Sequence, residues 1–325
     1  MKIKGKTLSE LLLKVIYLIY QFLFKKCNTY IANPSDYTFD DRSAGADNLM
    51  IILAGYQPYY WDGVFERVQK CKEQFHQNID ICVCCSCAPE SSREELSKIC
   101  VKNNWSFLYL NKNKVTQVQN TAIALHGKAK MIFKIDEDII LCDHYFDKMI
   151  EAYEYANNTL PYNVGFMGPL LNINAFCTPI FLSKINKIDE FQSKFGKYKL
   201  GGLLHTKEDF IHDNAEWARF IWQNSIPFDS VSKSIDNGVD IAVCPIRYSI
   251  GAILFNRSFI EKNGYLPVGF GTGMADDEVF LNDKCNEGMY SIAVATNIFV
   301  GHLGFGHQKE TCKQFYFAHQ QEIRK

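Results

Sequence analysis

The chain has 325 residues, of which 47% are hydrophobic, and its formal net charge is −1 at pH 7. A chain of this length and composition can bury a sizeable core, either as one large α/β domain or as two fused lobes. The near-neutral charge excludes a bulk electrostatic attraction to nucleic acid, so we expect no nucleic-acid partner.

An apolar run near the N-terminus, from Leu11 to Phe24, has lysines on both sides. The run is too short to cross a bilayer, which needs roughly 20 residues. Polar side chains recur at helical spacing at positions 10, 14, 17, 21 and 25. This pattern predicts that residues 1–30 form an amphipathic segment whose residues 8–26 lie on a membrane surface.

The N-terminal segment has two other possible interpretations. A helix that packs on the protein's own body or on a partner would show the same polar stripe. A signal peptide is disfavoured, because Lys14 interrupts the apolar part and no small-residue cleavage site follows.

The next stretch, residues 31–47, is polar and rich in Pro and Asp, which predicts a linker into the main domain. Beyond it, short apolar runs alternate with helical patterns. The expected strands are 49–55, 79–85, 106–110 and 130–135, and the expected helices are 61–75, 91–102 and 115–126. This alternation predicts an α/β fold with a mostly parallel, doubly wound sheet, whose ligands bind beyond the carboxyl ends of the strands.

Four of the twelve cysteines are crowded into Cys82 to Cys87, inside an apolar run. On a strand, Cys82 and Cys84 point away from Cys85 and Cys87, so the four thiols converge poorly on one zinc ion. We therefore expect small core residues in a reducing compartment.

Three consecutive carboxylates, Asp136, Glu137 and Asp138, end the strand expected at 130–135. Asp136 and Asp138 are two residues apart and point the same way on an extended segment. Such a pair at a strand end can hold a divalent cation, which takes oxygen ligands and bridges phosphates. The alternative is a solvated acidic turn.

After Tyr155 the pattern becomes irregular, and residues 165–240 resemble loops that carry substrate specificity. One helix is expected inside this region, at 213–223. Regular patterns return with strands at 241–245 and 248–255 and a helix at 257–263.

A second acidic cluster follows the Gly-rich turn 269–273. It consists of Asp276, Asp277 and Glu278, and it precedes a helix expected at 279–285. Carboxylates in the first turn of a helix are also ordinary helix chemistry. His302 and His307 follow, and His302 is either a metal or phosphate contact or a hydrogen-bonded core or loop histidine.

These elements, in this order, resemble the GT-A glycosyltransferases. Residues 134–138 resemble their Asp-x-Asp motif, and residues 269–281 resemble their Gly-rich turn with a Glu-Asp pair. Residues 244–252 are similar to the Pro-x-Tyr-x-x-Gly-Gly segment of the β-1,3-galactosyltransferase and fringe-like families. The resemblance covers roughly residues 49–307, and the N-terminal segment is more similar to bacterial enzymes of surface polysaccharide synthesis.

The resemblance implies a GT-A type fold with a nucleotide-sugar-binding half at 48–145 and an acceptor-binding and catalytic half at 146–325. It implies a divalent metal, Mn²⁺ or Mg²⁺, held by Asp136, Asp138 and His302. The implied contacts to the donor are Ala54, Tyr56, Gln117, Asn120, Lys134 and Asp136.

The catalytic base is one of the second acidic cluster, and its register stays open because the usual Glu-Asp pair reads Asp-Asp-Glu here. Alignment with galactosyltransferase-like sequences selects Asp276, alignment with many bacterial enzymes selects Asp277, and the fringe-like register selects Glu278. We favour Asp277, which is central in the triplet.

The implied activity is metal-dependent transfer of a sugar from a nucleotide-diphosphate sugar to a glycan or lipid-linked acceptor. The expected setting is surface polysaccharide synthesis, with the protein peripheral at the cytoplasmic face of the inner membrane. The alternatives are a nucleotidyltransferase, a metal-dependent phosphodiesterase and a non-catalytic sugar-binding relative.

Overall fold

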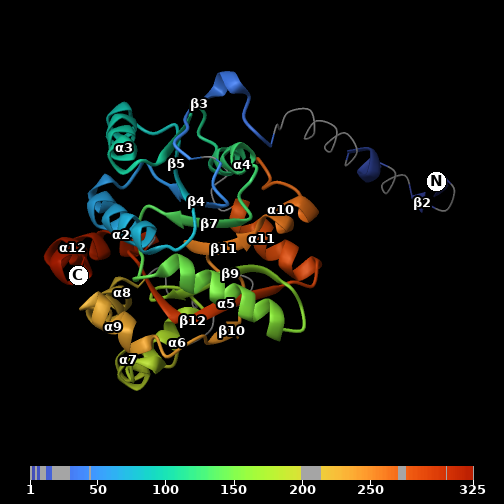
Figure 1. Cartoon of the computed structure of the whole chain (residues 1–325). Coiled ribbons are helices and arrows are strands. Elements are labelled where there is room, and N and C mark those ends of the chain that lie inside the picture. The colour runs from blue at the N-terminus through green and yellow to red at the C-terminus, as the bar shows by residue number, and fades with distance from the viewer. Residues whose placement is uncertain are drawn as a thin grey trace.

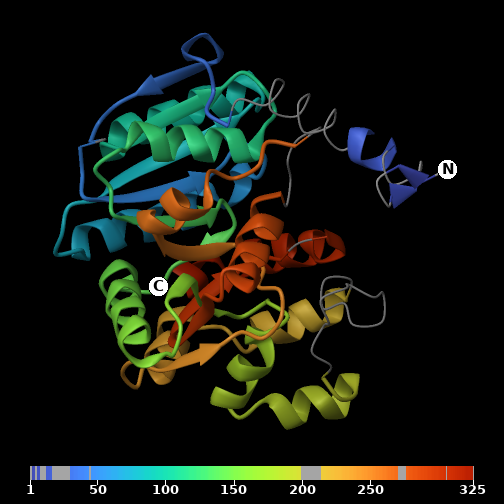
Figure 2. The same cartoon turned by 90° about the vertical axis from the view of Figure 1, so that its right-hand side faces the viewer.

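A computed structural model describes residues 2–3, 6–7, 12–16, 30–43, 45–198, 214–269, 276–304 and 306–324. Most of these residues belong to one α/β body built around a ten-stranded sheet (Figures 1 and 2). Strands from both halves of the chain, 48–145 and 146–325, join this sheet.

The sheet has the strand order β10-β12-β9-β11-β7-β4-β5-β6-β3, and β8 pairs with β12 off this path. The strands are β3 (Tyr37–Asp40), β4 (Asn48–Leu53), β5 (Asp80–Ser86), β6 (Ser106–Leu110), β7 (Met131–Asp136), β8 (Ile139–Ile140), β9 (Val164–Leu171), β10 (Ile241–Val243), β11 (Ala252–Asn256) and β12 (Ser291–His302). A separate pair is formed by β1 (Lys2–Ile3) and β2 (Lys6–Thr7).

The sheet is largely parallel. β4 pairs in parallel with β5 and β7, β5 with β6, and β9 with β12. β11 is antiparallel to both β7 and β9, so β9 and β12 run in the same direction as β4 to β7. The predicted α/β class with a mostly parallel, doubly wound sheet is confirmed.

Helices cover the sheet on both faces, with α2 and α3 on one side of β4 and β5 and α4 on the other (Figure 1). The helices are α2 (Trp61–Gln74), α3 (Glu90–Asn103), α4 (Val115–Leu125), α5 (Tyr145–Thr159), α6 (Cys177–Lys184), α7 (Ile188–Phe195), α8 (Ala215–Gln223), α9 (Phe228–Ile235), α10 (Arg257–Asn263), α11 (Asp276–Glu287), α12 (Lys309–Ala318) and α13 (Gln320–Arg324). Short 3-10 turns are η1 (Pro34–Asp36), η2 (Pro58–Tyr60) and η5 (Gly306–Gln308). This double covering explains why β5, β9 and β12 are buried along their whole length.

Two stretches are more regular than their sequence patterns predict. Residues 165–240 contain β9, in the middle of the sheet, and helices α6 to α9, so the expectation of an irregular region is wrong for most of its described residues. Within the stretch 31–47, residues 37–40 form β3, which pairs antiparallel with β6 at the edge of the sheet.

The N-terminal segment is described only in part. Residues 12–16 are helical (Figure 2). Their apolar side chains are exposed, with Leu13 at 66%. Most of the amphipathic stripe expected at 8–26 lies outside the described residues. Among the helices that the structure does describe, none has both the length and the hydropathy needed for a membrane span.

The cysteine cluster lies on β5 and just after it. Cys82, Cys84 and Cys85 are buried and Cys87 is exposed, and all four are free thiols. The Sγ atoms of Cys82 and Cys84 lie 3.8 Å apart on one side of the strand, as the alternation predicts.

A candidate active site at the carboxyl ends of the strands

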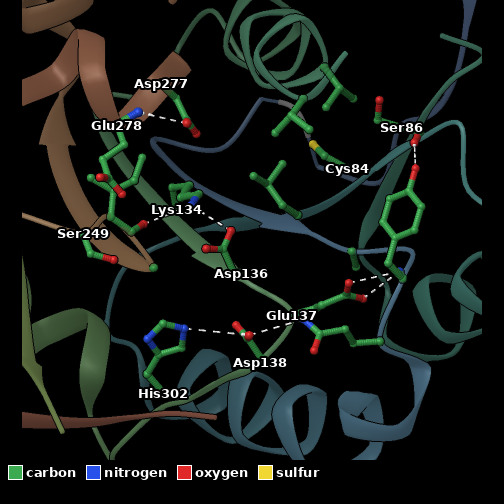
Figure 3. Close-up of a pocket in the computed structure, with 18 of the residues that line it drawn as sticks. Cys84, Ser86, Lys134, Asp136, Glu137, Asp138, Ser249, Asp277, Glu278 and His302 are labelled. Atoms are coloured by element: carbon green, nitrogen blue, oxygen red, sulfur yellow. Dashed lines mark hydrogen bonds and ion pairs between the residues drawn. The ribbon is translucent and has the colours of Figure 1, made fainter. Parts of the chain in front are cut away.

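A cavity of about 570 Å³ opens at the carboxyl ends of β4, β5 and β7. These three strands end at nearly the same height in the sheet, because Leu53 near the end of β4 pairs with Cys84 on β5 and with Asp136 on β7. The lining includes Ala54, Tyr56, Gln57, Ser86, Lys134, Asp136, Glu137, Asp138, Arg247, Ser249, Gly251, Asp277, Glu278, His302 and Lys309 (Figure 3). Residues of both acidic clusters predicted from the sequence therefore line one cavity, with Asp276 outside it.

Asp138 and His302 face each other across this cavity. The Nε2 atom of His302 lies 3.8 Å from the Oδ2 atom of Asp138, and the two residues are 4% and 5% exposed respectively (Figure 3). The backbone fixes this juxtaposition, since His302 on β12 pairs with Ile139 on β8 and the Leu303 amide donates to the Asp138 carbonyl at 3.0 Å. The pairing of β8 with β12 thus brings together two residues that are 164 positions apart in the sequence.

Asp136 is held by a buried lysine. The Nζ atom of Lys134 donates to the Asp136 carboxylate at 2.8 Å and to the Ile250 carbonyl at 2.9 Å. The position of Asp136 inside the cavity raises the pKa of its carboxyl group by desolvation, Lys134 opposes this rise, and Asp138 adds to it. Despite its own burial, Lys134 has a raised pKa because Asp136 and Asp277 surround it, so it stays a cation in the cavity wall.

Gly251 lies beside both Asp136 and His302. A Cβ atom at this position would lie 3.7 Å from the His302 ring and 3.9 Å from the Asp136 carboxylate. The Gly251 carbonyl also accepts a hydrogen bond from the Asp136 amide at 3.0 Å. The segment that resembles Pro-x-Tyr-x-x-Gly-Gly therefore ends against the acidic strand end.

The second acidic cluster divides at the start of α11. Asp277 is 4% exposed, and its carboxylate accepts hydrogen bonds from Gln119 Nε2 at 2.8 Å and from the Glu278 amide at 2.9 Å. Glu278 pairs with Arg247 at 2.6 Å. Burial raises the pKa of Glu278, although Arg247 opposes the rise. Asp276 is not in the cavity lining and lies against Gly269.

Of the two α4 residues expected near the donor, neither lines the cavity. Asn120 is fully buried. Its side-chain amide donates to the Leu266 carbonyl at 2.8 Å and accepts from the Leu266 amide at 3.0 Å. Gln117 is 6% exposed and also lies outside the lining. α4 reaches the site instead through Val115 and Val118, which line the cavity, and through the Gln119 contact with Asp277.

Sequence reasoning assigned no role to several lining residues, including Gln57, Glu137, Arg247 and Gly251. Glu137 was visible as the middle of the acidic triplet, and Arg247 as a lone charge in an apolar stretch. Gln57 carried no signal, because its contact with Asp138, 3.3 Å from Nε2 to Oδ2, depends on the tertiary fold.

The residues present fit a divalent cation that a ligand helps to coordinate. Among the described residues, no three His, Cys, Asp or Glu side chains converge as a complete metal-binding group. The Oδ1 atom of Asp138, however, is buried and makes no hydrogen bond within the described part of the chain. A carboxylate with an imidazole opposite matches an ion that takes its remaining ligands from phosphate groups and water.

No known family profile and no curated protein matches the sequence. Three solved structures are similar in fold. A mannosyltransferase from Pyrobaculum calidifontis, in complex with GDP-Man and Mn²⁺, has a TM-score of 0.45 and 13% identity; the match covers 88% of this chain and 64% of that one. A glucosyl-3-phosphoglycerate synthase from Mycobacterium tuberculosis has a TM-score of 0.43 and 9% identity. That match covers 87% of this chain and 80% of the synthase. The S. aureus protein TarS has a TM-score of 0.43 and 10% identity and covers 78% and 60%.

These likenesses are distant. The chain spans 64% of the length of the mannosyltransferase and 60% of the length of TarS. At such TM-scores they carry no argument on their own. The fold assignment rests on the strand order described above, and the function rests on the site.

Proposed function

We propose that this protein is a metal-dependent glycosyltransferase of the GT-A type, which transfers a sugar from a nucleotide-diphosphate sugar to an acceptor hydroxyl. The observation that carries the proposal is the meeting of two acidic clusters in one cavity. Asp136 ends β7 and Asp138 follows it, whereas Asp277 and Glu278 lie in the first turn of α11. The Lys134 ammonium group lies between the two clusters and interacts electrostatically with both Asp136 and Asp277.

The donor side of the cavity is the loop after β4 together with the end of β7. Ala54 and Tyr56 line it with neutral groups suited to a nucleoside, and Lys134 with Asp136 offers a cation and an acceptor to sugar hydroxyls. A divalent ion bound at Asp138 and His302, Mn²⁺ or Mg²⁺, would stabilise the negative charge that develops on the departing diphosphate.

The acceptor hydroxyl would attack the anomeric carbon of the donor, forming one C–O bond while the bond to the diphosphate oxygen breaks. Its proton passes to a carboxylate on α11. Asp277 suits this role, because it faces the cavity and its carboxylate is held by Gln119 and by the helix amide of Glu278. Glu278 is the second choice, because the guanidinium group of Arg247 stabilises its charged form and so opposes uptake of a proton.

On the acceptor side we propose a glycan or a lipid-linked glycan at the inner membrane, in surface polysaccharide synthesis. The exposed apolar side chains of Leu12, Leu13, Val15 and Ile16 support contact of the N-terminal segment with a membrane surface. This proposal places the protein at the cytoplasmic face as a peripheral protein.

The direct test is isothermal titration of the purified chain with a panel of nucleotide sugars and their nucleoside diphosphates, with MnCl₂ and with EDTA. Metal-dependent binding of one nucleotide class, followed by release of that nucleoside diphosphate in the presence of an acceptor, is the expected result. Cleavage of the donor at the diphosphate without glycoside formation would instead indicate a phosphodiesterase.

A further inference from the structure

Glu137, the middle residue of the acidic triplet, turns away from the metal candidates. Its carboxylate accepts hydrogen bonds from the Gly55 amide at 2.9 Å, the Tyr56 amide at 3.0 Å and the Trp61 indole Nε1 at 2.7 Å. Figure 3 shows that Asp138 is directed towards His302, whereas Glu137 points away from that pair. With 5% exposure and both oxygens occupied by N–H donors, Glu137 is poorly placed to ligate an ion.

The loop that Glu137 holds, residues 54–60, forms one side of the cavity. Ala54, Tyr56, Gln57 and Tyr59 all line it. The loop touches two other strand ends as well, because the Tyr56 hydroxyl donates to the Ser86 carbonyl at 2.7 Å and Gln57 donates to Asp138 at 3.3 Å. Glu137 accepts hydrogen bonds from this loop and from the adjoining Trp61, and those from the Gly55 amide and the Trp61 indole are more deeply buried than the Tyr56–Ser86 and Gln57–Asp138 contacts.

The backbone of the loop is shaped for this contact. Gly55 has a φ of +152°, a conformation that L side chains rarely adopt, and a Cβ atom there would lie 2.7 Å from Ala88 Cβ. The absence of a side chain lets two successive amides, those of Gly55 and Tyr56, point at one carboxylate. Charge-assisted bonds of this kind are roughly twice as strong as neutral ones.

We propose that Glu137 is a positioning residue that anchors the loop 54–60 to the end of β7 and so preforms the nucleotide side of the cavity. This inference rests on the proposed function, because it assigns the loop to the donor. The acidic triplet then has two separate tasks: Asp136 and Asp138 face the donor and its ion, and Glu137 holds the wall against which the nucleoside lies.

The test is the variant Glu137→Gln in the full chain, titrated with UDP and with GDP in MnCl₂. A glutamine has the same length, but only one of its two terminal atoms accepts, so its NH₂ group meets an N–H donor of the loop. We expect the Kd for the nucleotide that binds the wild-type protein to rise by about 10-fold or more, the scale on which supporting residues act. The binding stoichiometry should stay near the wild-type value.

The split between Kd and stoichiometry separates positioning from mere folding. If Glu137 only stabilised the chain, the variant would show a reduced binding-competent fraction with an unchanged Kd. Glu94→Gln, the same chemical change on the exposed side of α3, is the matched control and should change neither quantity. Trp61→Phe removes one of the three donors and should raise the Kd by less than Glu137→Gln does.

A wild-type Kd in Glu137→Gln overturns this inference and leaves the proposed function standing. If Glu137→Gln does not fold, Trp61→Phe decides: a raised Kd supports the inference and an unchanged Kd overturns it. If the wild-type protein binds neither nucleotide nor any nucleotide sugar, the proposed function fails and this inference fails with it.

Discussion

Asp138 and His302 are 164 positions apart in the sequence, yet their side chains stand 3.8 Å from each other on the paired strand ends of β8 and β12. That gap is too long for a hydrogen bond. A cation between them would receive one oxygen and one nitrogen ligand from the protein.

The first prediction follows from this pair. Asp138→Ala should abolish the effect of Mn²⁺ on nucleoside diphosphate affinity, and His302→Ala should weaken it by about 10-fold or more. Titration with MnCl₂ and with EDTA measures the effect. Asp189→Asn, an exposed change on α7, is the control. A metal effect that survives in Asp138→Ala would remove this residue from the metal site.

The second prediction concerns the base. Asp277→Asn keeps the shape of the side chain and an acceptor for Gln119 but removes basicity, so turnover should fall at least about 100-fold with little change in donor affinity. Asp276→Asn should stay within a few-fold of the wild type, because Asp276 lies against Gly269 outside the cavity lining.

Glu278→Gln separates the remaining candidate. Loss of its ion pair with Arg247 should raise the acceptor KM more than it lowers kcat if Glu278 only shapes the site. Steady-state rates at saturating donor distinguish the three variants. Near-normal kcat in Asp277→Asn together with a 100-fold loss in Glu278→Gln would move the base to Glu278.

The third prediction is a pH dependence of binding that is separate from unfolding. Burial raises the pKa of Asp136, Glu137 and Glu278, so each of these groups takes up its proton at a higher pH than an ordinary carboxyl group of its kind does. Metal-dependent nucleotide affinity should therefore weaken as the pH falls through these raised pKa values.

The free energy of unfolding should not fall over the pH range in which nucleotide affinity weakens. A carboxyl whose pKa is raised on folding binds its proton more tightly in the folded state, so acidification through that pKa does not lower the free energy of unfolding. Acid destabilisation begins lower, where groups such as Asp240, whose pKa Lys184 lowers, are protonated. Thermal midpoints that fall in parallel with affinity would contradict this ordering.

The fourth prediction tests the packing behind the cavity. A Cβ atom at Gly168 on β9 would collide with the ring and hydroxyl of Tyr248, which is fully buried and donates to the Pro169 carbonyl at 2.8 Å. Gly168→Ala should lower the free energy of unfolding by about 1–3 kcal/mol, the usual cost of overpacking. Urea denaturation measures the loss.

Gly127→Ala is the matched control for Gly168→Ala. The nearest atom to its added Cβ is the Ala124 carbonyl oxygen at 3.9 Å, an ordinary contact. This variant should be close to wild type, and an equal loss at both positions would show that backbone freedom, not the Tyr248 contact, sets the cost.

The fifth prediction concerns the membrane. Deleting residues 1–26 should move the protein from anionic vesicles into the supernatant in a sedimentation assay while nucleotide affinity is kept. The paired change Leu12→Ser and Leu13→Ser removes exposed apolar surface without shortening the chain, and it should also weaken vesicle binding. Full-length protein that stays in the supernatant would exclude this anchor.

Local pattern was sufficient for the first half of the fold. The strand expected at 106–110 has the observed bounds, and the other elements predicted between 49 and 135 differ by at most two residues at either end. In the second half, the helix expected at 257–263 also has the observed bounds. β9 could not be predicted, because Gly165, Gly168 and Pro169 argue against a central strand. Gly165 and Gly168 leave room for the side chains of Cys285 and Tyr248, which are distant in the sequence, so the local sequence does not reveal these contacts.

The candidate site shows the same division. Residues with distinctive chemistry at a strand end or helix start, such as Asp138 and Asp277, were predicted and line the cavity. Gln117 and Asn120 lie outside the cavity lining, whereas Gln119 contacts Asp277. Which of these three side chains faces the site depends on how α4 is rotated against β4 and β5. Helix rotation is set by packing, which periodicity constrains only coarsely.

The pairing of β8 with β12 has an evolutionary consequence. Since the main chain alone sets the distance between positions 138 and 302, side chains at these positions can be exchanged without moving the place they surround. An aspartate or asparagine in place of the imidazole would give an all-oxygen pair, which suits Mg²⁺ better than ions that prefer nitrogen. If an ion is held at this pair as proposed, one substitution at position 302 would change the metal preference and leave the architecture of the sheet untouched.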